Sequence, residues 1–213
     1  MEMDYGIDIA ELDREAARLG GEPGTSRDSV HAPAEIALGA RRQVLAGADF
    51  ARAGQSDERL DKVFEQLAET FATLPAVISE GRAWTYQELD SRANQFARLL
   101  VKRGVRPGDR VGLILDRSAE TYVALLAVVK AGAAFVPLAT AFPQERMALI
   151  IEDAGVSLVV TIATYASRAG ELPVPHLLID SAAAEISAQS DAPLKPHKAQ
   201  AATAIEDICY ILY

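Results

Sequence analysis

The chain has 213 residues, half of them hydrophobic, and it carries a formal net charge of −9 at pH 7. This length allows one large domain, or one domain with an extension, and the apolar fraction is enough for a sizeable core. The acidic balance and the lack of a long basic run argue against a nucleic-acid partner, because such surfaces neutralise phosphates with lysine and arginine.

Cysteine usage and the start of the chain bear on the compartment. Cys209 is the only cysteine, which excludes an internal disulfide and a cysteine-based metal site. The acidic first residues lack the apolar core of a signal peptide. We therefore expect a reducing, cytoplasmic setting.

Residues 1–57 are expected to form an N-terminal extension of helices and loops. Apolar residues recur at helical spacing over residues 9–19, and residues 34–50 are compatible with a second helix. A stretch rich in Gly, Pro and Ser separates the two and indicates a loop. We interpret the extension as a loosely held tail, with a docking arm or the remnant of an upstream linker as the alternative. The folded region is then residues 58–213.

A helix, a hairpin and a longer helix are predicted next. Apolar residues form one helical stripe over residues 60–71. Short apolar runs on both sides of a Ser-Glu-Gly-Arg turn predict a hairpin over residues 76–84. Thr85 and Glu88 have the spacing of a capping box, in which each side chain accepts a hydrogen bond from the other residue's backbone amide. A clean apolar stripe then continues to Leu100.

A further helix is predicted between Ser118, which can cap its start, and Gly132, which can end it. The spacing i, i+3, i+4 and i+7 assigns its apolar face to Tyr122, Leu125, Leu126 and Val129. The apolar run continues past this helix to residue 142, but a glycine and a proline interrupt it. We therefore exclude a membrane-spanning helix and a membrane partner.

Strands and helices alternate over this part of the chain. Short apolar runs predict strands at residues 111–115, 133–138, 157–161 and 176–179. Pro143 opens another helix, whose apolar face consists of Met147, Ile150, Ile151 and Ala154. Residues 181–204 have the composition of a surface segment with one short helix, whereas residues 208–213 are apolar and β-prone. We expect the latter to form a central strand with helices over both faces. The alternation predicts an α/β fold with a largely parallel sheet flanked by helices.

Three acidic or basic features have more than one interpretation. Lys130 lies within an apolar run, and burial lowers the pKa of a lysine, so one interpretation is catalytic. We favour a lysine in the last turn of a helix, where it stabilises the helix dipole and its stem covers apolar surface. Asp116 follows a strand at the edge where α/β ligand sites form, and we interpret it as a turn residue and helix-start anion. Glu206 and Asp207 resemble a carboxylate pair for acid–base chemistry, but a polar strand entry is the favoured interpretation.

Other chemistry-bearing residues lack the required context. The histidines have no metal-ligand spacing, and they are His31, His176 and His197. The serines considered as nucleophiles lack a Gly-x-Ser-x-Gly context, and they are Ser26, Ser79 and Ser118. Neither the dinucleotide-binding nor the P-loop glycine pattern is present. The sequence thus assigns no catalytic residue, no cofactor-binding residue and no metal ligand.

Three motifs, in order, resemble those of one enzyme family. They read WTYQELDSRANQFARLL at residues 84–100, VVKAGAAFVPL followed by FPQERMALIIEDAG at residues 128–155, and DICYILY at residues 207–213. Together they resemble the N-terminal part of an amino-acid adenylation domain, the nonribosomal peptide synthetase branch of the adenylate-forming enzymes. The resemblance covers residues 60–213 approximately. It departs from the family at Ala139, Thr140 and Phe142, where the family usually has Asp, Pro and Tyr.

The resemblance implies a function for a larger parent protein. Such an enzyme activates an amino or other carboxylic acid with ATP and Mg²⁺ to an acyl-adenylate. It then transfers the acyl group to a thiol on the phosphopantetheine arm of a carrier protein. The family's phosphate-binding loop would begin after Tyr213, and its ribose-binding Asp, magnesium-binding Glu and catalytic Lys match no position here. We therefore expect an incomplete large lobe that is inactive alone and needs the remainder of the domain as its partner.

Two alternatives of other kinds stay open. One is a catalytically inactive half-fold that acts as a binding or interaction protein, with residues 1–57 as its contact arm. The other is a fragment of an acyl-CoA ligase from the same superfamily. The family's specificity pocket lies outside the match, so the resemblance names no particular acid.

Overall fold

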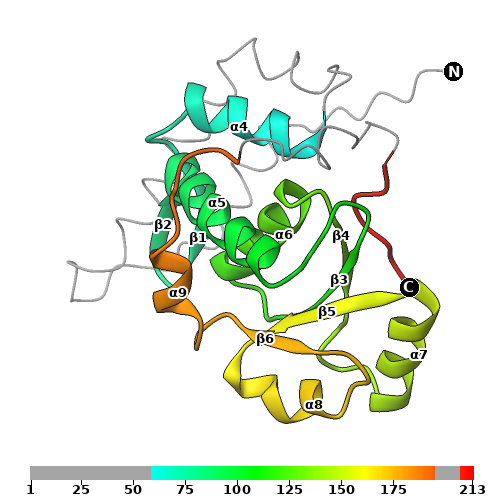
Figure 1. Cartoon of the computed structure of the whole chain (residues 1–213). Helices are drawn as coiled ribbons and strands as arrows, with labels where there is room; N and C mark the ends of the chain where they lie inside the picture. The colour runs from blue at the N-terminus through cyan, green and yellow to red at the C-terminus, as the bar shows by residue number, and fades with distance from the viewer. Residues whose placement is uncertain (1–58, 195–206) are drawn as a thin grey trace, which may run out of the picture. The chain divides into compact units, whose positions relative to one another are not determined.

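In the computed structural model, residues 59–194 and 207–213 are described (Figure 1). The helices predicted at residues 9–19 and 34–50 lie outside the described residues, so the division near residue 57 stays a prediction. The described elements, in chain order, are α4 (Leu60–Thr70), β1 (Pro75–Ser79), β2 (Arg82–Thr85), α5 (Tyr86–Lys102), β3 (Arg110–Ile114), α6 (Ala119–Lys130), β4 (Ala134–Pro137), α7 (Gln144–Ala154), β5 (Val156–Thr161), η1 (Ala163–Tyr165), α8 (Ala166–Gly170), β6 (His176–Leu178) and α9 (Ala183–Ser187).

A parallel four-stranded sheet with the strand order β4-β3-β5-β6 forms the centre (Figure 1). Successive residues of β3 face opposite ways, so Leu113 joins one buried cluster and Ile114 the other. Helices α5, α6 and α9 cover the first face, and α7 and α8 cover the second. The predicted α/β class with a largely parallel sheet and flanking helices is confirmed.

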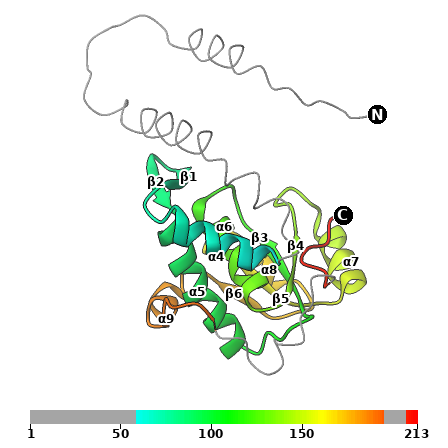
Figure 2. The ribbon, with the colours of Figure 1, turned by 90° about the horizontal axis from the view of Figure 1, so that it is seen from above.

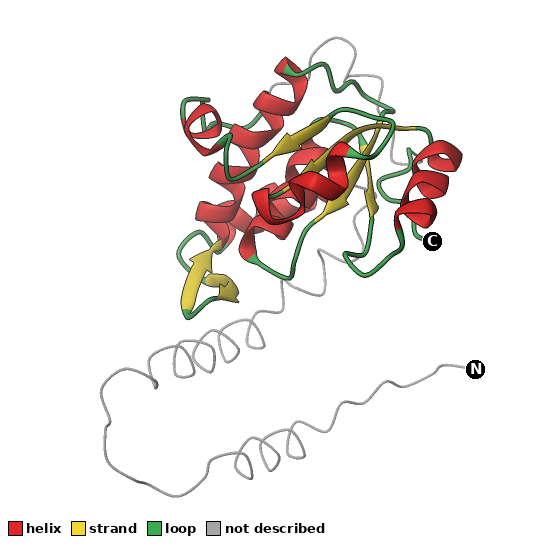
Figure 3. Cartoon of the chain, turned by 90° about the horizontal axis from the view of Figure 1, so that it is seen from below, coloured by secondary structure: helices red, strands yellow, loops and turns green. Residues whose placement is uncertain are grey.

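The hairpin β1–β2 stands apart from this sheet, at the amino end of α5 (Figure 3). Thr85 ends the hairpin and caps α5: its Oγ1 accepts from the Glu88 amide at 3.1 Å, and a Glu88 carboxylate oxygen accepts from the Thr85 amide at 2.8 Å. The hydrogen bond from Thr85, with the nearby Arg82 guanidinium, lowers the pKa of Glu88. The predicted capping box is therefore confirmed.

The start and the face of α6 differ from the prediction. Ser118 occupies the cap position, but its hydroxyl accepts no backbone amide and instead lies 3.5 Å from the Thr121 hydroxyl. The predicted apolar face is only partly right: Leu126 and Val129 are buried, but Tyr122 is 50% exposed, and Val123 and Ala127, which lie outside that face, are buried as well. The reason is that α6 is covered on more than one side: α4 lies across α5 and α6 (Figure 2), and the sheet lies beneath.

Helix α7 agrees with the prediction. Met147, Ile150, Ile151 and Ala154 are all buried. Gly155 ends the helix in the left-handed conformation with φ of 63°, where glycine is favoured because it has no Cβ. The short elements η1 and α8 were not predicted, since five or fewer residues leave too little periodicity to detect.

The segment 207–213, called the edge segment below, differs most from its prediction. It pairs with β4 on one side only: Phe135 donates to the Cys209 carbonyl and Ile211 donates to the Phe135 carbonyl, each at 3.0 Å. Tyr210 stacks on Phe135, with 5.7 Å between the ring centroids. Ile208 and Leu212 are each 67% exposed. In the described part of the chain no strand lies on its outer side, so it is an edge and not the expected central strand.

Candidate functional site at the carboxyl edge of the sheet

The strand order defines where a ligand site is expected. The chain passes from β3 to β4 on one side, and then crosses to β5 on the other side of β3. In parallel sheets, ligands bind beyond the carboxyl ends of the strands at such a reversal. Asp116 follows β3 and Tyr165 follows β5, so the fold brings these two residues to that place. We call Asp116, Thr140, Tyr165 and Arg168 the carboxyl-edge cluster.

A short hydrogen bond links the two sides of this edge. The Tyr165 hydroxyl donates to Asp116 Oδ1 at 2.6 Å, across 49 positions of sequence. This bond favours the neutral phenol and raises the pKa of Tyr165, although Thr140 and Arg168 oppose the shift. The backbone carbonyl of Asp116 also accepts a hydrogen bond from the Thr121 hydroxyl. Asp116 thus lies in the connection between β3 and α6, with a partner that the sequence did not reveal.

Arg168 holds the loop that follows β4. Its guanidinium donates to the carbonyls of Thr140 and Phe142, and the Gln144 side-chain amide donates to the Arg168 carbonyl at 2.9 Å. The Arg146 guanidinium lies 4.2 Å from the centre of the Phe142 ring. This is the loop in which the sequence departs from its family. The Arg168 contacts are to backbone carbonyls and so do not depend on the replaced side chains, whereas Tyr165 also hydrogen-bonds with the side chain of Thr140, one of the replaced positions.

The carboxyl-edge cluster can accept and donate hydrogen bonds, but it lacks reactive machinery of its own. Its carboxylate and phenol are paired with each other, and its guanidinium is paired with backbone carbonyls. Within the described residues, no group of three or more His, Cys, Asp and Glu side chains is placed to hold a metal ion. The cluster therefore fixes the geometry of three loops at the edge where a ligand would arrive.

Lys130 lies at the opposite end of the sheet. Helix α6 returns from the carboxyl end of β3 to the amino end of β4, and Lys130 is in its last turn. Its ammonium side chain is 1% exposed and lies 2.7 Å from Glu65 Oε1 and 2.9 Å from Asp90 Oδ1. Burial raises the pKa of Glu65, but the hydrogen bonds and charges of Lys130 and Lys62 outweigh burial and leave it lowered. The helix-end interpretation is confirmed, with the correction that Lys130 is fully ion-paired and not merely laid along apolar surface.

Asn94 extends this buried group. Its side-chain amide donates to Asp90 Oδ2 at 2.8 Å and to the Asp191 carbonyl at 2.9 Å. Helices α4, α5 and α6 each contribute at least one charged member, namely Glu65, Asp90 and Lys130. The group thus ties three helices together, far from the carboxyl edge.

The other residues considered from the sequence are not brought together. His176 is exposed at the start of β6, Ser79 ends β1, and Asp207 is exposed at the start of the edge segment. Cys209 is half-buried. The remaining candidates lie outside the described residues, and they are Ser26, His31, His197 and Glu206. No helix among the described residues is long and apolar enough to cross a membrane.

Comparison with known proteins establishes the class. Residues 64–213 match the family of AMP-binding enzymes, and the chain belongs to that family. The recognition of an adenylation domain from the sequence motifs is thereby confirmed.

Particular relatives refine this assignment. The chain is 39% identical over 152 residues to surfactin synthase subunit 2 of Bacillus subtilis (strain 168), a match that covers 71% of this chain and 4% of that protein. It is 31% identical to the nonribosomal peptide synthetase FmoA3 in its α-methyl-L-serine-AMP bound form, with a TM-score of 0.65 over 73% of this chain and 17% of that one. It shares its fold with NpsA-ThdA of Klebsiella oxytoca, an artificially fused adenylation–PCP di-domain, at 21% identity and a TM-score of 0.63, covering 73% of this chain and 28% of that one. The chain therefore spans a small part of the relatives it matches.

Proposed function

We propose that this chain is the first part of the large lobe of an adenylation domain. That domain would activate an amino acid with ATP and pass the acyl group to a carrier-protein thiol in nonribosomal peptide synthesis. The observation that carries the proposal is the family match over residues 64–213. The similarity to FmoA3, whose structure has α-methyl-L-serine-AMP bound, supports an aminoacyl-adenylate as the product.

The described residues fit a supporting role better than a binding role for the nucleotide. They contain neither a glycine-rich phosphate loop nor a metal-binding group, so these residues by themselves do not account for ATP and Mg²⁺ binding. The edge segment runs parallel to β4 and so points toward the carboxyl edge. On this proposal, the phosphate-binding loop would continue from Tyr213 in that direction. The Tyr213 hydroxyl donates to Asp153 of α7, which fixes the segment at its end.

The work of these residues is then positional. Activation requires that the carboxylate of the acid approach the α-phosphate in line, with phosphate charge neutralised by fixed donors. The carboxyl-edge cluster sets the loops after β3, β4 and β5. The buried Lys130 group holds the helices behind them. Chemistry by this chain in isolation is not expected.

One alternative has an observation in its favour. Ile208 and Leu212 expose large apolar side chains on an edge that no other described strand pairs, which is the kind of surface that another polypeptide covers. An interaction protein built on half of an adenylation fold would use this edge for its partner. On the main proposal, the same edge is covered by the remainder of the domain.

The test is to recover the natural polypeptide from its source with an antibody raised against this chain. Its intact mass and its amino-acid-dependent ATP–pyrophosphate exchange are then measured. A mass far above 22.8 kDa together with exchange for one or a few amino acids is the expected result. A larger polypeptide that instead forms acyl-CoA would identify the ligase branch. A polypeptide of 22.8 kDa without exchange would overturn the proposal and favour the interaction protein.

A further inference from the structure

The chain has to cross the whole sheet between β6 and the edge segment. β6 is the last strand on one side, and the edge segment lies beside β4 on the other. With neighbouring strands about 4.8 Å apart, these two positions are separated by roughly 19 Å. A parallel connection of this kind is usually made by a packed helix. Here the short helix α9 is followed by an irregular stretch, residues 188–194, that we call the strap (Figure 1).

Side chains of α5 hold the strap through its backbone. Arg98 donates to three strap carbonyls, those of Ser190 at 2.9 Å, Ala192 at 2.6 Å and Pro193 at 3.1 Å. Asn94 donates to the Asp191 carbonyl at 2.9 Å, and Gln95 donates more weakly to the Gln189 carbonyl at 3.3 Å. Four consecutive carbonyls, from residue 190 to residue 193, thus accept hydrogen bonds from one helix face.

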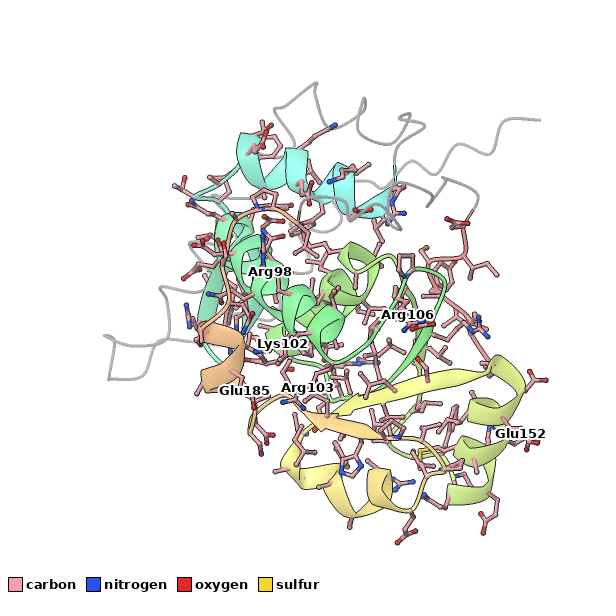
Figure 4. The ribbon with its side chains drawn as sticks, in the orientation of Figure 1. Arg98, Lys102, Arg103, Arg106, Glu152 and Glu185 are labelled. Atoms are coloured by element: carbon pink, nitrogen blue, oxygen red, sulfur yellow. The ribbon has the colours of Figure 1, made fainter. Side chains whose placement is uncertain are left out.

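The strap's own side chains contribute little to this attachment. Most of them are exposed, and Leu194 is the strap residue that packs against the main buried cluster. The donors lie on a helix whose other face is buried: Asn94 is 1% exposed, Ala93 and Ala97 are fully buried, and Arg98 itself is half-buried. Arg103, directly after α5, also pairs with Glu185 of α9 at 2.7 Å, which sets the end of the strap nearest β6 (Figure 4). The helix therefore determines where the strap lies.

We propose that Arg98 is a positioning residue for the edge segment. By fixing the strap on α5, it determines the point from which residues 195–206 start. It thereby determines how the edge segment docks on β4. One consequence of this inference rests on the proposed function, namely that Arg98 helps to place the phosphate-binding loop expected after Tyr213. The coupling itself is a property of this chain and is tested without any enzymatic activity.

Two natural reporters make the test direct. Cys209, the only cysteine, lies in the edge segment, so the rate at which a thiol reagent modifies it reports how well that segment is docked. Trp84, the only tryptophan, lies in β2 and reports global unfolding by its fluorescence. The full chain is studied as Arg98→Ala, Arg98→Lys and the matched control Arg92→Ala. Arg92 is on the same helix but donates to the Ser187 hydroxyl and not to a strap carbonyl.

Arg98→Ala is expected to speed modification of Cys209 about five-fold, the effect of losing one net hydrogen bond. It is also expected to raise hydrogen exchange at strap amides and at the Ile211 amide, with Trp84 unchanged. Arg98→Lys should fall between Arg98→Ala and the parent chain, because an ammonium reaches fewer carbonyls than a guanidinium. Arg92→Ala should match the parent chain.

Two results would overturn the proposal. In the first, the strap loses protection in Arg98→Ala while Cys209 reacts at its original rate, so the strap does not position the edge segment. In the second, Arg98→Lys and Arg92→Ala speed the thiol reaction equally, so the effect is not specific to the carbonyl contacts. If Arg98→Ala unfolds, Gln95→Ala serves as a milder variant. If Cys209 is then modified no faster in Gln95→Ala and Arg98→Lys than in the parent chain, the coupling is refuted as well. These measurements of thiol modification and hydrogen exchange do not depend on whether the natural polypeptide catalyses ATP–pyrophosphate exchange.

Discussion

Replacing Lys130 by methionine is expected to destabilise the fold strongly. The substitution keeps an unbranched side chain, one heavy atom shorter, but removes an ammonium that is 1% exposed and lies between two carboxylates. The side chains of Glu65 and Asp90 are each only 15% exposed, so both would be left as poorly solvated charges. Removing one partner of a buried ion pair typically costs 3–5 kcal/mol, and we expect about 3 kcal/mol here because Lys62 still pairs with Glu65.

The assay is urea denaturation followed by the fluorescence of Trp84, analysed for the free energy of unfolding. A companion triple variant, Lys130→Met with Glu65→Gln and Asp90→Asn, removes the stranded charges. It should recover at least half of the loss, because burying uncharged groups is less unfavourable than burying uncompensated carboxylates. A loss below about 1 kcal/mol for the single variant would mean that the pair is screened like a surface salt bridge, and would refute the reasoning. A triple variant no more stable than the single one would refute it as well.

Three further predictions follow from local contacts. Folding lowers the pKa of Glu65, so the ionised Glu65 carboxylate stabilises the fold fully above its unfolded pKa, and this stabilisation is lost as the pH falls through its folded pKa. Urea titrations at several pH values should show that Lys130→Met flattens this acid dependence. In thermal melts, Thr85→Ala should lower the free energy of unfolding by about 1 kcal/mol, and Ser118→Ala should change it by less than about 0.5 kcal/mol. The reason is that the Thr85 hydroxyl accepts a hydrogen bond from a helix amide and the Ser118 hydroxyl does not. Equal losses would contradict these two cap assignments. Gly112→Ala should destabilise the fold by about 1–3 kcal/mol in the same melts. The new methyl group would lie 3.1 Å and 3.2 Å from two side-chain carbons on the second face of the sheet. An unchanged melting temperature would show that this face can relax.

Local chemistry was readable from the sequence wherever neighbours in the chain carry the interaction. The capping pair Thr85 and Glu88 is three residues apart, and Gly155 ends its helix by a conformation that glycine favours. The parallel sheet followed from the alternation of apolar runs and helical stripes. Such signals fail when burial comes from several sides. Helix α6 is covered by two helices and the sheet, so a single-face pattern placed Tyr122 inside although it is half exposed.

The candidate site was only partly readable, because its contacts join distant positions. Asp116 was recognised at the end of a strand, but its partner Tyr165 is 49 positions away in an element too short to predict. Lys130 stood out as a charge in an apolar run, and its carboxylate Glu65 is 65 positions away. Arg98 gave no signal, because an arginine on the polar side of a helix ordinarily faces solvent and its acceptors are backbone carbonyls. Carbonyl acceptors leave no trace in the residue types of the strap.

The two charged groups lie at opposite ends of the sheet, and this separates their consequences. Lys130 and its carboxylates sit at the amino ends of the strands, where they join three helices. Asp116, Tyr165 and Arg168 sit at the carboxyl ends, where they join loops. Substitutions in the first group should therefore reduce the amount of folded protein without changing the properties of each folded molecule. Substitutions in the second should leave stability nearly unchanged and alter the loops beside any ligand. If variants of Lys130 lowered the proposed adenylation activity per folded molecule, the two ends of the sheet would be coupled through α6. The positional role proposed for the carboxyl edge would then have to extend along that helix.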